Sequence, residues 1–190
     1  PPYLVDPLSV IQESSRLMVN SIEDYLNISR IEQGRMKYEK SKFDLAELSQ
    51  KVVNEFQAVA KQKSIAFVYG GGEAAMVNAD IGKIKQVLTN LIDNAIKYTK
   101  QGSVTVSVAK APTGVRVTVA DTGVGISKED IPKLFSKFTR ARDANKVNTT
   151  GTGLGLYVVK QLVEGNGGKT WIESAGSGKG SHFIVELPAA

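Results

Sequence analysis

The sequence predicts an α+β fold: a two-layer sandwich of a mixed, mostly antiparallel sheet and helices, preceded by a long N-terminal helix. Two observations carry this prediction. Residues 103–109 and 115–120 alternate apolar and polar side chains around a turn at 112–114, which is typical of a β-hairpin. Strands and helices follow one another in mixed order, which favours helices layered on one face of an antiparallel sheet over a parallel βαβ arrangement.

The N-terminal helix is expected to begin at Asp6 and Pro7, because Asp caps free amides and Pro is tolerated at the first helical position. Its seam then repeats at steps of three and four over about three heptads, at Leu8, Ile11, Ser15, Met18, Ile22 and Tyr25. This pattern fits either a helix packed on its own domain or a helix of a dimerising coiled coil. A charged linker after Gly34 separates a first segment, 1–40, from a second domain, 41–190.

The second domain begins where Asp44 and Glu47 form a capping-box-like pair. The polar stretch that includes residues 139–150 is long for a connection in a compact domain, as a lid over a ligand would be, although a flexible surface loop is equally consistent with it. The other expected elements are helices at 44–62, 81–98 and 154–164, a short helix after Ser127, and strands at 65–69, 75–78, 169–174 and 181–187.

Composition excludes several classes of function. The 190 residues are 42% hydrophobic and 23% charged, which is typical of globular proteins, and they contain no cysteine for disulfides, thiolate nucleophiles or cysteine-ligated metals. No apolar run of about 18 residues and no signal peptide is present, so we expect a cytoplasmic segment without direct membrane contact. We also expect this segment to be part of a longer parent protein, for which inner-membrane anchoring is left open. The net charge of +5 is scattered, which argues against a nucleic-acid partner.

The helix at 81–98 has two different faces. An apolar stripe is expected to face the core, and on the other side polar residues recur at steps of four, four and three: Gln86, Asn90, Asn94 and Lys97. A neutral amide oxygen can ligate Mg²⁺ while phosphates and water supply the other ligands, and a lysine can face phosphate oxygens. A merely solvated helix face would show the same pattern.

Two glycine-bearing segments follow. Residues 121–126, Asp-Thr-Gly-Val-Gly-Ile, come directly after a strand. There an ionised Asp121 can accept a hydrogen bond from the amino group of adenine and would repel the carbonyl of guanine, although a plain Asp-Gly turn is the alternative. Residues 151–156, Gly-Thr-Gly-Leu-Gly-Leu, open a helix whose amides can bind an anion. Their spacing matches neither a Walker loop nor a dinucleotide-binding fingerprint.

Taken in order, these segments resemble the catalytic and ATP-binding domain of sensor histidine kinases, within the gyrase, heat-shock chaperone, histidine kinase and MutL ATPase superfamily. The resemblance extends to the second helix of the family's dimerisation and phosphotransfer hairpin, which favours the coiled-coil interpretation of the N-terminal helix. The segments concerned are 14–37 for the hairpin helix, 43–45 for the domain junction, 86–99 for the N box, 121–126 for the G1 box, 134–138 for the F box and 151–156 for the G2 box.

The resemblance implies ATP and Mg²⁺ as cofactors and a role for each matching residue. Asn94 would ligate the metal, Asn90 and Lys97 would contact phosphates or order the metal's waters, and Asp121 would accept the adenine amino group. Phe138 would anchor a lid. The nucleotide-binding residues implied are Asn90, Asn94, Lys97, Tyr98, Asp121, Gly123, Gly125, Ile126, Phe138, Arg140, Gly151, Thr152, Gly153, Leu154 and Gly155.

The implied function is that of the ATP-binding catalytic domain of a two-component sensor histidine kinase, a phosphotransferase. Its partners would be ATP or ADP, the phosphotransfer hairpin of the parent kinase, a response regulator and a second copy bound through the N-terminal helix. The family's acceptor histidine lies on the first hairpin helix, whereas the single histidine of this sequence, His182, lies in the last strand. We therefore expect no catalytic residue and no autophosphorylation in this chain alone.

The alternative function is a nucleotide-gated binding module or an ATPase without kinase activity. Hydrolytic relatives carry an acidic residue at the start of the N box, whereas Gln86 cannot act as a base, so hydrolysis is disfavoured. Asn166 stands where the family often has a histidine, and the sequence alone gives this change no consequence.

Overall fold

The computed structural model describes residues 7–141 and 152–190 and divides the chain into two compact units, Pro1–Lys37 and Tyr38–Ala190. The first unit contains helix α1, Pro7–Glu32. Its C-terminus is closed by Gly34, which has φ of +63°. The amide of Gly34 donates to Ile31 O and that of Arg35 donates to Arg30 O, a pairing that satisfies the last carbonyls of a helix.

The second unit is built on a five-stranded sheet with the order β2-β4-β5-β7-β6. Only β2 and β4 run parallel, and the other neighbours are antiparallel. The predicted mixed, mostly antiparallel sheet is thereby confirmed. The strands are β2 (Ala66–Tyr69), β4 (Ser103–Ala111), β5 (Gly114–Asp121), β6 (Lys169–Glu173) and β7 (Ser181–Leu187).

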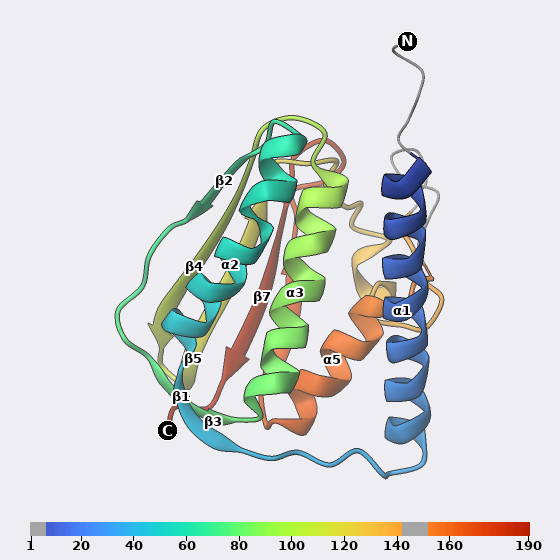
Figure 1. Ribbon diagram of the computed structural model, residues 1–190. Helices are drawn as coiled ribbons and strands as arrows, with labels where there is room; N and C mark the ends of the chain where they lie inside the picture. The colour runs from blue at the N-terminus through green and yellow to red at the C-terminus, as the bar shows by residue number, and fades with distance from the viewer. Residues whose placement is uncertain (1–6, 142–151) are drawn as a thin grey trace. The chain divides into compact units, whose positions relative to one another are not determined.

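Three helices cover one face of this sheet (Figure 1): α2 (Leu45–Gln62), α3 (Ile81–Tyr98) and α5 (Gly155–Gly165). The Asp44 carboxylate caps α2 by accepting from the Ala46 amide at 2.9 Å, as expected, whereas Glu47 pairs with Lys51 on the exposed side. The short helix predicted after Ser127 is a single 3₁₀ turn, η1 (Ile131–Lys133).

A second, two-stranded sheet pairs β1 (Ser41–Asp44) with β3 (Met76–Ala79). Strand β1 was not predicted, because the charged residues after Gly34 indicate a linker. Two of the four residues of β1 are exposed and one of them is the charged Lys42, so no alternation of apolar side chains marks the strand. The strand that pairs with it, Met76–Ala79, is more than thirty residues away.

The core lies between the sheet and the helices. The apolar stripe predicted on α3 is at most 1% exposed, and the inward side chains of β4 and β5 are buried as well, with Val104, Val106 and Val119 at 0% exposure. Burying each such side chain contributes about 1.5–3 kcal/mol, which fixes α3 rigidly and so fixes the direction of its polar face. Among the residues described, no helix is long and apolar enough to cross a membrane.

Candidate functional site

The polar face of α3 forms one side of the candidate site. Asn90, Asn94 and Lys97 are all half-buried there, as the periodicity predicted. The Nδ2 atom of Asn90 is buried and finds no hydrogen-bond partner among the described residues. A buried polar atom in this condition needs a water or a ligand to satisfy it.

Positive charge gathers at the C-terminal end of α3. Burial lowers the pKa of the Lys97 ammonium, the Asp93 carboxylate opposes that shift, and the charges of Arg140 and Lys63 add to it. The Lys97 ammonium also lies 5.6 Å from the centre of the Tyr98 ring. Lys97 and Arg140, far apart in sequence, therefore sense each other's charge, and an anion bound between them would relieve their repulsion.

Asp121 is the last residue of β5 and is only 7% exposed. Burial raises the pKa of its carboxyl group, while hydrogen bonds from Gly123 and Ser181 and the nearby His182 act in the opposite direction. The Gly123 amide donates to Asp121 Oδ1 at 2.8 Å. The carboxylate keeps unused acceptor positions, which suits it to receive an amino group.

The loop after Asp121 is held by backbone hydrogen bonds to α3 on one side and to the β6–β7 turn on the other. The Val124 amide donates to Tyr98 O at the end of α3, at 3.2 Å, and the Gly178 amide donates to Val124 O at 2.6 Å. Gly125 has φ of +65°, and a Cβ at this position would overlap the carbonyl oxygen of Gly176. A side chain on Gly123 would likewise run into the Tyr98 carbonyl. The two glycines are therefore required by the close approach of three backbone segments.

Residues of the β6–β7 turn complete this loop, and the sequence analysis did not assign them a role. The hydroxyl of Ser174 accepts from the Ile126 amide at 3.0 Å, and the Gly180 amide donates to Gly123 O at 3.2 Å. Ile126 itself is buried, at 6% exposure. The glycine-rich spacing of 176–180 was the available signal, but which loop it supports becomes visible only through strand pairing.

The remaining predicted residues lie where α5 begins and after η1. Gly153 lies against the backbone of Phe138 and Thr139, since a Cβ on it would be 2.9 Å from Phe138 C and 3.0 Å from Thr139 N. Phe138, predicted as a lid anchor, is 75% exposed, whereas Leu134 is buried at 5% exposure. The other predicted residues here are Arg140, which is half-buried, Thr152, whose hydroxyl accepts from the amide of the buried Leu154, and Gly155, the first residue of α5. Gly151 lies outside the described residues.

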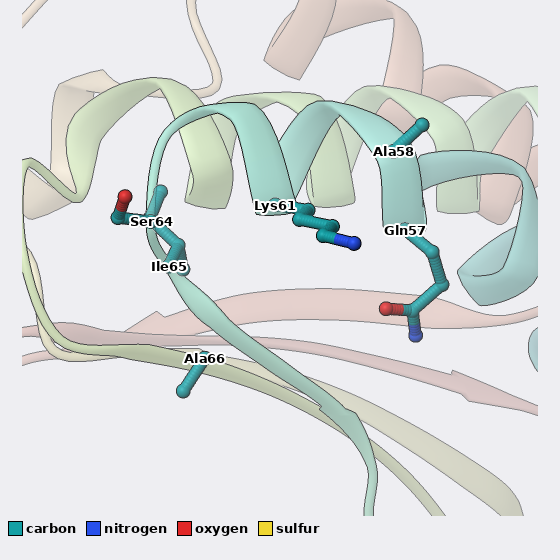
Figure 2. A pocket seen from close by; sticks show the side chains of 6 residues that line it. All are labelled: Gln57, Ala58, Lys61, Ser64, Ile65 and Ala66. Carbon is teal, nitrogen blue, oxygen red and sulfur yellow. The ribbon is translucent and has the colours of Figure 1, made fainter.

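A separate hollow of about 450 Å³ lies between α2 and β2 and contains none of the residues predicted from the sequence (Figure 2). Its lining is Gln57, Ala58, Lys61, Ser64, Ile65 and Ala66. Gln57 spans it, with Nε2 3.5 Å from Phe67 O. Neither this hollow nor any other place in the described parts of the chain holds three or more His, Cys, Asp or Glu side chains grouped for a metal ion.

Comparison with known proteins agrees with this geometry. The family model for the histidine kinase-, DNA gyrase B- and HSP90-like ATPase matches residues 79–190. The sensor histidine kinase GacS of Pseudomonas protegens is 32% identical over 98% of this chain, which spans only 21% of that protein.

Solved structures show the same fold. Full-length ShkA in complex with AMPPNP superposes with a TM-score of 0.79 at 28% identity, over 96% of this chain and 38% of ShkA. The histidine kinase AdeS of Acinetobacter baumannii gives a TM-score of 0.77 at 25% identity, over 95% of this chain and 83% of that one.

Proposed function

We propose, from the premise that the chain belongs to the histidine kinase-, DNA gyrase B- and HSP90-like ATPase family, that Mg²⁺-ATP binds between α3 and the loop after β5. The chain contains an ATP-binding catalytic domain of the sensor histidine kinase type. The observation that carries the proposed site is the hydrogen bond from Val124 N to Tyr98 O, because it joins the end of the polar helix face to the loop of Asp121.

In this proposal the base and the phosphates use different parts of the site. Asp121 accepts a hydrogen bond from the amino group of adenine, while Tyr98 and Ile126 line the pocket for the base. Asn90, Lys97 and Arg140 face the phosphates. A phosphate oxygen would accept a hydrogen bond from Asn90 Nδ2, and the phosphate charge would reduce the repulsion between Lys97 and Arg140. Thr152, Gly153, Leu154 and Gly155 would lie over the triphosphate.

Mg²⁺ fits the site as an ion that arrives with the nucleotide. Asn94 offers a single half-buried amide oxygen, one turn from Asn90, and the described residues around it hold no acidic cluster. Such a neutral oxygen suits Mg²⁺ when phosphate oxygens and water supply the remaining ligands. When bound, the ion would neutralise charge on the phosphates.

The reaction that we propose is transfer of the γ-phosphoryl group to a histidine on the phosphotransfer hairpin of the parent protein, from which a response regulator would receive it. The domain contributes positioning and charge stabilisation, since the acceptor lies elsewhere. The Gln86 amide cannot act as a base towards water, which supports transfer over hydrolysis. The exposed side chains of Ile11, Met18 and Ile22 on α1 repeat at heptad spacing, which supports pairing with a second copy.

Labelled ATP mixed with the chain and a separately made hairpin of the parent protein tests this function. We expect acid-labile, base-stable label on the hairpin. Rapid release of free phosphate without transfer would contradict kinase activity and support the ATPase alternative.

A matched pair of variants tests the metal assignment. Asn94→Ala should abolish the Mg²⁺-dependent part of nucleotide affinity, measured by calorimetry with and without EDTA. Asn54→Ala changes the same residue type on the exposed side of α2 and should leave affinity unchanged. If Asn94→Ala binds Mg²⁺-ATP as the unaltered chain does, Asn94 is not the metal ligand.

A further inference from the structure

Tyr38, the first residue of the second unit, is docked on α5. A Cβ on Gly165, the last residue of α5, would overlap the hydroxyl end of the Tyr38 ring, so the ring occupies the space that this glycine leaves. The Tyr38 hydroxyl also donates to Gln161 O at 3.4 Å. Burial and the nearby Asp80 carboxylate raise the pKa of the hydroxyl.

The next residue is fixed by a chain of hydrogen bonds. The Glu39 amide donates to Asp80 Oδ2 at 3.0 Å, and Asp80 Oδ1 caps α3 by accepting from the Lys83 amide. Asn166 holds Asp80 in turn: its Oδ1 accepts from the Asp80 amide at 2.7 Å and its Nδ2 donates to Leu162 O at 2.8 Å. Asn166 is 1% exposed. The residue that departs from the family pattern is therefore the inner member of this anchor.

The other side of the boundary is also closed, because α1 ends in the hydrogen-bonded cap at Gly34 and Arg35. Only Met36 and Lys37 lie between that cap and Tyr38. Two residues of the charged linker after Gly34 thus separate the helix cap from the docked tyrosine.

We propose that Tyr38, docked against Gly165 and followed by the Glu39 amide that Asp80 holds, is a positioning residue for phosphoryl transfer because it confines the hinge between the two units to Met36 and Lys37. This inference rests on the proposed kinase function. Releasing Tyr38 and Glu39 would lengthen the free tether from two residues to the five before β1. Since effective concentration falls roughly as the −3/2 power of tether length, transfer should slow about fourfold.

A double-mutant cycle tests the anchor itself. Alanine has a higher helix propensity than glycine. Gly165→Ala should therefore raise the urea midpoint if no side chain occupies the space that the new Cβ needs. We expect Gly165→Ala to lower the midpoint in the unaltered chain and to raise it in the Tyr38→Ala background. Equal shifts in both backgrounds would show that Tyr38 does not dock on Gly165.

Kinetics test the positioning role in the parent protein, which we expect to carry the acceptor histidine. Tyr38→Ala and Gly165→Ala each leave the Glu39 amide on Asp80. The free tether therefore grows from two residues to three, and single-turnover transfer should slow about twofold, with the KM for ATP unchanged. Tyr69→Ala is the control, because Tyr69, on β2, donates a similar hydrogen bond from its hydroxyl to Ala46 O. Unchanged transfer in Tyr38→Ala, or a parallel change in KM, overturns the positioning role. If the unaltered parent transfers no phosphate, the proposed function fails instead, and the stability cycle still decides the anchor.

Discussion

Glu186 on β7 should make the stability of this protein depend on pH below neutrality. The residue pairs with Arg116 of β5, at a register position that alternates with the buried valines of that strand, and is 3% exposed. Its carboxylate accepts from the Thr113 hydroxyl and pairs with Arg116 Nη2 at 2.8 Å and Lys169 Nζ at 3.0 Å. These hydrogen bonds, that from Thr113 first, lower its pKa from 4.5 to about 2.

The shift sets an upper limit on the effect. A change from 4.5 to about 2 corresponds to about 3.4 kcal/mol of stability. Its cationic partners Arg116 and Lys169 are 41% and 60% exposed. Solvent therefore screens the pairs, and we expect about 1–2 kcal/mol.

The sign follows from the direction of the shift. Because the folded pKa is lowered, the contribution is complete above the unfolded value of 4.5 and is lost as the pH falls through about 2. Urea unfolding of the unaltered chain and of Glu186→Gln, measured from pH 7 to pH 2.5, should show a difference that shrinks on acidification. Glu47→Gln, in an exposed helical pair with Lys51, is the control and should show a difference of a few tenths of a kcal/mol at most. A Glu186→Gln difference that stays constant with pH would refute the reasoning.

Three further predictions concern the site and its support. Asn166→Ala should lower the free energy of unfolding by about 2 kcal/mol in urea, since it leaves the Asp80 amide without its acceptor, whereas Leu162 O keeps the backbone amide of residue 166. Gly125→Ala should abolish ATP binding in a fluorescence titration, because its Cβ would displace the Gly176 turn; unchanged affinity would show that the loop tolerates the shift. Thr99→Val should increase the free energy of unfolding of the nucleotide-free chain by about 1 kcal/mol, because Thr99 Oγ1 is buried and has no hydrogen-bond partner among the described residues. The change is measured as a rise in the melting temperature.

The elements predicted best from sequence are those with a local repeating pattern. The helix at 81–98 has the bounds of α3, and the hairpin of β4 and β5 forms where apolar residues alternate. What could not be predicted depends on contacts between distant residues. The pairing of β1 with β3 and the parallel pairing of β2 with β4 leave no local signal. Tyr38 looks like an ordinary linker residue until Gly165 is placed beside it.

The candidate base site also shows why a sequence motif there needs its distant supports. Asp121 must remain ionised to receive an amino group, yet burial raises its pKa. The opposing hydrogen bonds come from Gly123, whose position depends on Gly180, and from Ser181 on the neighbouring strand. The β6–β7 turn thus acts on the chemistry of Asp121 as well as on the shape of its loop. A nucleotide amino group would add one more donor to the same carboxylate, so binding should favour its ionised form and strengthen as pH rises through the raised pKa.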